Sequence, residues 1–163
     1  MAKPALDADQ VRQVFHYDAE TGVFTWRITL GKGRAGRPAG NVNRDGYLDI
    51  GIYGRKYPAG RLAWLYVHGE WPKAQIDHMD GEKLNNRIAN LRDVDARMNQ
   101  ENMRKARVDN VSKFLGVTAC QDHFISRIKI KGRQIILGKF TTAEEAHETY
   151  LKAKREHHAG CTI

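Results

Sequence analysis

IDHMDGEKLNNRIANLRDVDARMNQENM, residues 76–103, combines an Asp-His pair, an Asn-rich segment and a short helical pattern in one span. Strands are expected at 75–79 and 91–94, because a turn-rich segment that begins with Asp-Gly separates two apolar runs. Asp95 is a favourable N-cap for a helix over about 96–104. This stretch therefore predicts a β-hairpin followed by a short helix.

Three polar side chains fall at the ends of these elements. Asp77 and His78 close the first strand, and Asn99 lies in the first turn of the helix. Carboxylate and amide oxygens suit a hard divalent cation, and a neutral imidazole beside the cation can take a proton from water. Neighbours on a regular strand point to opposite faces, so Asp77 and His78 share a site only if the strand ends or twists there. These residues predict metal-dependent hydrolysis of a phosphodiester bond.

Composition narrows the partner and the compartment. The chain has 163 residues, a formal net charge of +8 and a pI near 9.6, which favours a polyanionic partner. This length allows one medium domain or two small ones. No apolar run reaches the roughly eighteen residues of a membrane span, and the N-terminus lacks the apolar segment of a signal peptide. Cys120 and Cys161 lie far apart and outside any CxxC pair, so free thiols in a reducing cytoplasm are expected rather than a zinc knuckle.

The N-terminal part predicts a short helix over 5–16, with Asp7 as its N-cap, followed by a turn and a strand. Residues 27–44 carry five basic residues, four glycines and no acidic residue, which is typical of a mobile cationic loop. Phosphate contact and a solvated linker are both open interpretations of this loop. Alternating strands follow, and a short apolar helix is expected at 60–68.

The C-terminal part predicts a small sheet covered by one helix. Within 114–140 the clearest strand alternates apolar and basic positions, which puts a basic face opposite an apolar one. The two sets are Phe124, Ser126, Ile128 and Ile130 on one face, and Ile125, Arg127, Lys129 and Lys131 on the other. Lys131-Gly132 marks the hairpin turn, and Thr141 or Thr142 caps the helix that follows. The stripe expected to pack on the sheet comprises Ala143, Ala146, Tyr150, Ala153 and His157.

Two segments resemble known families. Residues 61–102 carry DH-x-DG, NN and NLR at the spacing of the HNH endonuclease family, in the subgroup common in phages and among homing endonucleases. Residues 114–158 carry GV, F-x-x-x-I-x-I-x-G and LG-x-F-T-T-x-EEA, and they resemble the ethylene-response-factor type of DNA-binding domain. The first resemblance implies a ββα-metal nuclease unit, and the second implies a sheet that binds DNA.

The HNH resemblance implies a role for each polar residue of the central stretch. His78 matches the general base that activates water, and Asp77 and Asn99 match two metal ligands. Asn90 matches the middle residue of the motif, which braces the loop and helps to orient the histidine. An Asn in place of the last His of the motif favours Mg²⁺ or Mn²⁺ over zinc.

Alternative interpretations exist for several polar residues. Asn102 shares a helix face with Asn99 and is a rival ligand, whereas Asn85 and Asn86 are favoured as turn formers. Structural or solvent-exposed roles are expected for the remaining histidines considered, which are His16, His68, His123, His157 and His158.

Four basic residues of the C-terminal hairpin are the candidate DNA contacts, and a solvated sheet face is the alternative. They are Arg127, Lys129, Lys131 and Arg133. The chain departs from the HNH pattern at Gly60, where His is common, and from the second pattern at Phe124, where Trp is common.

Together the patterns predict an α+β protein with an HNH nuclease domain over 1–106, a linker over 107–113 and a DNA-binding domain over 114–163, the last built from a three-stranded antiparallel sheet packed on one helix. The expected activity is metal-dependent nicking or cleavage of double-stranded DNA. It is expected to need one divalent cation and no small-molecule cofactor, and the protein is not expected to bind a membrane.

The expected compartment is the cytoplasm, or the host cytoplasm for a phage-encoded protein. A catalytically inactive, sequence-specific DNA-binding regulator is the alternative. An RNA-binding protein fits less well, because no aromatic stacking motif of the usual RNA modules occurs. Monomer and homodimer are both open.

Overall fold

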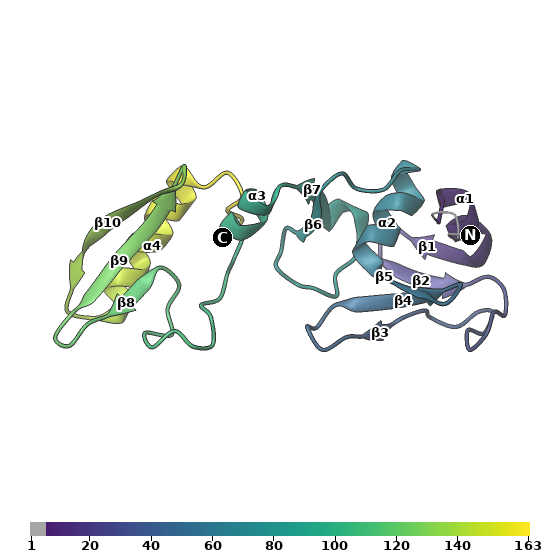
Figure 1. The fold of residues 1–163 in the computed structure, drawn as a ribbon, viewed down its shortest axis with the longest axis horizontal. Coiled ribbons are helices and arrows are strands. Elements are labelled where there is room, and N and C mark those ends of the chain that lie inside the picture. Colours follow the sequence, from purple (N-terminus) through teal and green to yellow (C-terminus); the bar gives the residue numbers. More distant parts are fainter. Residues whose placement is uncertain (1–5) are drawn as a thin grey trace. The chain divides into compact units, whose positions relative to one another are not determined.

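The structure, a computed structural model, describes residues 6–163 and divides into two compact units, Met1–Val94 and Asp95–Ile163 (Figure 1). The first unit contains α1 (Ala8–Val14), β1 (Phe15–Asp18), β2 (Val23–Trp26), β3 (Asn41–Val42), β4 (Leu48–Ile52), β5 (Arg55–Pro58), α2 (Ala59–His68), β6 (Gln75–His78), the 3-10 helix η1 (Ile88–Asn90) and β7 (Leu91–Val94). The second unit contains α3 (Ala96–Glu101), β8 (Val117–Ala119), β9 (Phe124–Ile130), β10 (Arg133–Phe140) and α4 (Ala143–His157). Every strand pair among these elements is antiparallel, which fits the expected α+β class.

Local capping starts α1 where the sequence predicts it. The Asp7 carboxylate accepts a hydrogen bond from the Gln10 N–H at 2.8 Å, and the Gln10 side chain accepts one from the Asp7 N–H at 3.1 Å. These reciprocal bonds satisfy amide groups that a helix start leaves without intrahelical partners. The helix is shorter than the expected range 5–16, because Phe15 already has extended backbone and opens β1. Residue 5 lies outside the described residues.

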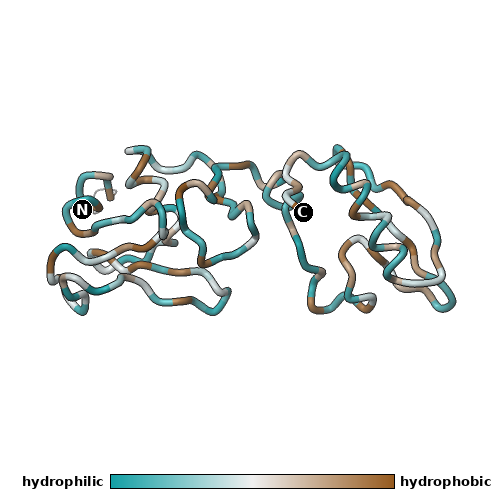
Figure 2. Tube along the Cα trace, turned by 180° about the vertical axis from the view of Figure 1, so that it is seen from behind, coloured by the Kyte–Doolittle hydropathy of each residue, from teal (hydrophilic) through white to brown (hydrophobic). Residues whose placement is uncertain are grey.

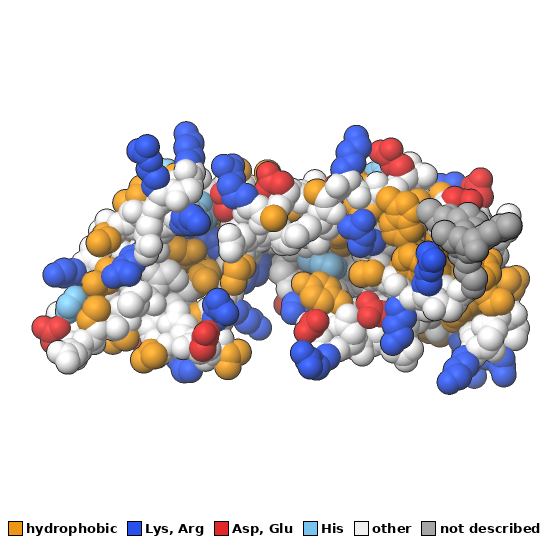
Figure 3. Space-filling model, in the orientation of Figure 1, with side chains coloured by type: hydrophobic (Ala, Val, Ile, Leu, Met, Phe, Trp, Pro, Cys, Tyr) orange, Lys and Arg blue, Asp and Glu red, His pale blue; other side chains and the backbone are white. Residues whose placement is uncertain are grey.

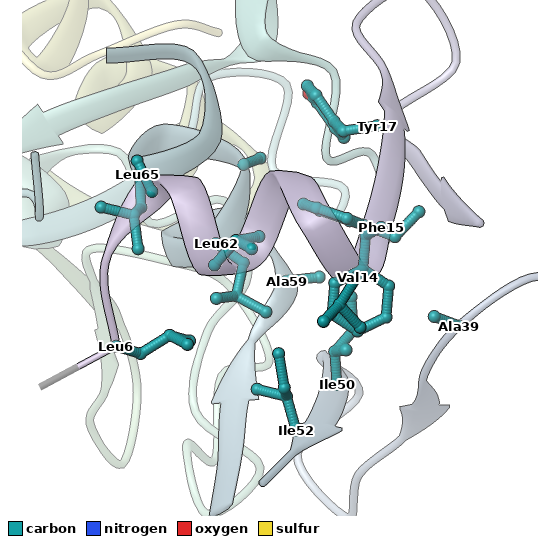
Figure 4. Packing of buried hydrophobic residues seen from close by; sticks show 14 of the residues in the cluster. Leu6, Val14, Phe15, Tyr17, Ala39, Ile50, Ile52, Ala59, Leu62 and Leu65 are labelled. Carbon is teal, nitrogen blue, oxygen red and sulfur yellow. The ribbon is translucent and has the colours of Figure 1, made fainter. Parts of the chain in front are cut away.

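The core of the first unit joins the two helices to the strands. Figure 4 shows Val14 of α1, Leu62 of α2 and Ile50 of β4 converging in this core. Leu91 of β7 is buried in the same cluster, and Ile76 of β6 packs against it. The β6–β7 hairpin is therefore fixed to the core by its apolar positions, which determines where its polar residues lie.

The second unit is a sheet in the order β10-β9-β8 with α4 packed against it (Figure 1). Lys131 and Gly132 both have positive φ, of 48° and 83°, and form the two-residue turn between β9 and β10. Ser126 and Ile128 are buried on the apolar face of β9, while Lys129 on the opposite face is exposed. The predicted separation of a basic face from an apolar face is confirmed for these strand positions.

Only a narrow stripe of α4 meets the sheet, and most of the helix is hydrophilic (Figure 2). Four of its five expected members are buried, namely Ala143, Ala146, Tyr150 and Ala153. His157 is exposed, so the prediction that it completes the stripe is wrong. Lys154 is buried in its place, and its ammonium donates a hydrogen bond to the Met103 carbonyl. Burial lowers the pKa of Lys154.

Compact packing divides the chain after Val94, and the domain boundary expected after residue 106 stays a prediction. Helix α3 and the residues after it are bonded to the C-terminal tail. The Gly160 N–H donates to Glu101 Oε2 at 3.2 Å, and Arg104 donates to the Thr162 carbonyl at 3.0 Å. The chain order β6, β7, α3 is the order that a ββα unit requires, and the packing of α3 on that hairpin stays a prediction.

Candidate active site

The β6–β7 hairpin holds the predicted Asp-His pair at its end. Asp77 lies opposite Arg92 in the ladder, and His78 lies opposite Leu91. Both polar side chains are buried, with 6% of Asp77 and 8% of His78 exposed. The Gly81 N–H bonds the His78 carbonyl at 2.9 Å, so the chain turns immediately after the histidine. The strand therefore ends at His78, and a strand end is one of the two conditions under which Asp77 and His78 can share a site.

The Asp77 carboxylate is paired with an arginine. Arg92 Nε and Nη2 approach Asp77 Oδ2 at 2.8 Å and 2.7 Å, which are distances typical of charge-assisted hydrogen bonds. This pairing compensates a buried negative charge. A carboxylate offers about four lone-pair sites over two oxygens, so the arginine does not exhaust its capacity to bind a cation.

An amide holds the imidazole of His78. His78 Nε2 lies 3.2 Å from Asn86 Oδ1, and this amide oxygen can only accept a hydrogen bond. In a neutral ring this contact favours the tautomer with the proton on Nε2, in which Nδ1 is the basic nitrogen. Asn86 is 2% exposed, and its backbone carbonyl accepts a hydrogen bond from the Tyr17 hydroxyl at 2.6 Å. The sequence favours Asn86 as a turn former, and no local signal indicates that a tyrosine of β1 supports it.

Asn90 braces the loop that follows the histidine. Its Nδ2 donates to Asp80 Oδ1 at 2.9 Å and to the Asn85 carbonyl at 2.8 Å, while its Oδ1 accepts from the Asp80 N–H at 3.0 Å. Burial raises the pKa of Asp80, but hydrogen bonds from the Glu82 N–H, Asn85 and Asn90 outweigh it, so the pKa lies below its ordinary value. These contacts match the bracing expected of Asn90, and its influence on the histidine stays a prediction.

The two rival ligands on α3 have different surroundings. Asn102, at the end of the helix, is buried, and its Oδ1 accepts a hydrogen bond from the Thr162 hydroxyl. Asn99 is half-buried and lies within α3. The tail contact gives Asn102 a structural role, and the choice of Asn99 as the ligand stays a prediction. The approach of Asn99 to Asp77 and His78 stays a prediction.

The structure distributes the four candidate DNA contacts over both faces of the C-terminal hairpin. Arg127 and Lys129 lie on the face of β9 that is directed away from α4, and Lys131 lies in the turn. Arg133 pairs with Ile130, and paired residues share a face, so Arg133 belongs to the side that also carries the apolar residues. Figure 3 shows Lys and Arg side chains among hydrophobic ones over the visible face of this unit.

A β-bulge adds a basic residue that sequence reasoning missed. The register shifts between Ile136 and Gly138, and this extra residue brings Lys139 opposite Ile125. Without the bulge, strict alternation would direct Lys139 to the other face. Lys139 therefore shares a face with Arg127 and Lys129, and it is exposed.

Comparison with known protein families finds one match, in the segment that contains the Asp-His pair. Residues 57–101 match the family model described as HNH endonuclease, so this part of the chain is an HNH endonuclease domain and points to nuclease action on DNA. No curated protein and no solved structure shows significant similarity to the chain. The resemblance of the C-terminal unit to the ethylene-response-factor type stays a prediction. No helix among residues 6–163 is long and apolar enough to cross a membrane.

The expected preference for Mg²⁺ or Mn²⁺ over zinc stays a prediction. Within residues 6–163, no group of three or more His, Cys, Asp and Glu side chains comes together as a metal cluster. Asp77 supplies one buried carboxylate, and carboxylate oxygens are the ligands that hard cations such as Mg²⁺ prefer.

Tyr17→Phe should lower the stability of the protein in a pH-dependent way. Burial raises the pKa of Tyr17 to about 12 from an ordinary value of 10.0, so the hydroxyl contributes stability that is present below pH 10 and lost as pH rises towards 12. At pH 8 the variant should be less stable by about 1–3 kcal/mol, because the buried Asn86 carbonyl loses its donor. Denaturant unfolding at pH 8 and pH 11 should show the gap narrowing, whereas an equal gap at both pH values would contradict this role.

Proposed function

We propose that this protein is a metal-dependent endonuclease that hydrolyses phosphodiester bonds of double-stranded DNA. The observation that carries the proposal is the buried His78, held through Nε2 by Asn86 at the end of β6, inside the segment that matches the HNH endonuclease family. A buried imidazole whose basic nitrogen is fixed by a neighbouring acceptor is suited to general-base catalysis.

In the proposed reaction, His78 Nδ1 takes the proton of the attacking water. Asn86 favours the tautomer that leaves Nδ1 basic, and Arg92 orients the Asp77 carboxylate. Mg²⁺ or Mn²⁺, bound by Asp77 and Asn99, would polarise the phosphate and stabilise negative charge on the leaving 3′ oxygen. One such site per chain suits a monomer that nicks a single strand, and a double-strand break then needs a dimer or rebinding.

We propose that the C-terminal unit holds the DNA. The outer face of its sheet carries Arg127, Lys129 and Lys139, and the whole chain has a net charge of +8. A two-stranded β element fits the major groove, where arginine can read guanine bidentately. The 27–44 loop and the segment 104–113 are alternative basic surfaces for the same contact.

A plasmid assay separates the enzyme from an inactive DNA-binding regulator. Supercoiled plasmid is incubated with the protein and Mg²⁺ or Mn²⁺, with and without excess chelator, and DNA binding is measured in parallel. The nuclease converts plasmid to the nicked or linear form only when the metal is present. Tight binding without any conversion, at every metal concentration, would favour the regulator and contradict the proposal.

Neutralising Lys129 and Lys131 together should weaken DNA binding and reduce its salt dependence. Each lost phosphate contact lowers the log–log slope of affinity against salt by about one unit. The measurement is a salt titration of duplex binding for wild type and the Lys129→Gln, Lys131→Gln variant. Lys152→Gln, which removes one exposed charge from α4, is the control. An unchanged slope in the double variant would move the DNA contact to the 27–44 loop or to 104–113.

A further inference from the structure

We propose that Tyr47 is a substrate-positioning residue, whose ring borders the path of the DNA strand to His78. This inference rests on the proposed nuclease function and adds a substrate-contacting surface to the same site. Tyr47 belongs to the turn between β3 and β4, outside the HNH match over 57–101.

The turn that presents Tyr47 is held in one conformation by its own bonds. Asn43 Oδ1 accepts hydrogen bonds from the N–H groups of Asp45 and Tyr47, both at 3.0 Å, and the Asn43 N–H donates to the Tyr47 carbonyl at 2.8 Å. Gly46 has a φ of 85°, which a glycine adopts without strain. Asn43 Nδ2 also donates to Asp49 Oδ2 at 3.1 Å, which ties the turn to β4. The Tyr47 ring therefore starts from a defined backbone.

Lys83, in the loop that follows His78, holds this turn against that loop. Lys83 Nζ donates to the Asp45 carbonyl at 2.8 Å and lies 4.7 Å from the centroid of the Tyr47 ring. The Tyr47 ring is tilted by 45° against the His78 ring, with the two centroids 6.0 Å apart. One exposed aromatic ring and one cation thus lie at the edge of the buried general base.

The exposure of Tyr47 argues for contact with a ligand. Tyr47 is 37% exposed, whereas Tyr17, which supports Asn86, is 5% exposed. An aromatic face beside a cation is the combination with which proteins hold nucleic-acid strands, by stacking on a base or a sugar while the cation meets a phosphate. Arg44, exposed in the same turn, adds positive charge. The chemistry fits a DNA strand whose scissile phosphate lies at His78.

Tyr47→Ala should weaken productive DNA binding more than it slows the chemical step. Loss of one base–aromatic stack, worth about 1–3 kcal/mol, corresponds to a rise of about 5- to 150-fold in the half-saturating concentration. Tyr47→Phe keeps the ring and should stay close to wild type. Tyr53→Ala is the matched control, because Tyr53 is an exposed tyrosine at the opposite end of β4.

The experiment measures single-turnover cleavage of a DNA duplex over a range of protein concentrations, so that the half-saturating concentration and the maximal rate are obtained separately. Fluorescence anisotropy of the same duplex is measured with each substitution placed in a His78→Ala background. A large rise in half-saturation for Tyr47→Ala, with Tyr47→Phe and Tyr53→Ala near wild type, supports the proposal. Wild-type affinity of Tyr47→Ala in both assays, or an equal loss in Tyr47→Phe, overturns it. If the wild type binds DNA without cutting it, the proposed function fails, and the anisotropy arm still decides the role of Tyr47.

Discussion

His78→Ala should lose cleavage by about 10²–10⁴-fold, the usual contribution of a positioned general base, while its affinity for DNA stays near wild type. The imidazole acts on the water in the transition state, and it is 8% exposed, so little of it is available to bind DNA directly. The measurement is single-turnover cleavage together with equilibrium binding of one duplex. An unaltered cleavage rate in the purified variant would remove His78 from the mechanism.

Two controls test whether a loss of cleavage reflects the chemical role of His78 rather than unfolding or the loss of any histidine. His16→Ala removes an exposed histidine of β1 in the same unit and should cut DNA normally. His78→Ala also deprives Asn86 Oδ1 of its imidazole partner, so thermal unfolding of the variant must be compared with wild type. A folded variant that binds DNA and does not cut it isolates the chemical role.

Asp77→Asn should raise the Mg²⁺ or Mn²⁺ concentration needed for cleavage by at least about 10- to 100-fold, the loss seen even for residues that only orient metal ligands. The amide keeps an acceptor for Arg92, whereas alanine would leave this arginine without its 2.7 Å partner, which costs stability. The reason for the effect is the loss of a charged oxygen ligand from a hard cation. Metal titrations of the cleavage rate check it, and an unchanged metal requirement would contradict the ligand role.

Asn99→Ala should shift the metal requirement in the same direction as Asp77→Asn. Asn102→Ala is its matched control on the same helix, because Asn102 accepts a hydrogen bond from Thr162 and should affect the stability of the tail rather than the metal requirement. If Asn99→Ala behaves as wild type while Asn102→Ala is inactive, the ligand position on α3 has been assigned to the wrong residue.

The local structure of the site could be read from the sequence because short-range chemistry determines it. Asp95 caps α3 by accepting from the Met98 N–H at 2.8 Å, and the second strand of the hairpin has the expected bounds, Leu91–Val94. The first strand ends at His78, one residue before the expected end, because the turn closes on the His78 carbonyl. Capping and turn signals of this kind act within a few residues, so one sequence reveals them.

The parts that sequence reasoning missed depend on residues far apart in the chain. Asn86 becomes a partner of His78 because Tyr17 holds its backbone from β1. Lys139 joins the basic face only through the register shift in β10. Neither residue periodicity nor turn chemistry encodes these long-range contacts, because tertiary packing selects them.

The most direct measurement of the central claim is the conversion of supercoiled plasmid by wild type and His78→Ala, at equal protein concentration, with Mg²⁺ and with Mg²⁺ plus excess chelator. The account predicts nicked product from the wild type with free metal, and almost none from the chelated sample or from the folded, DNA-binding variant. Equal product from His78→Ala, or from the chelated wild type, would contradict a metal-dependent nuclease that uses His78 as its base.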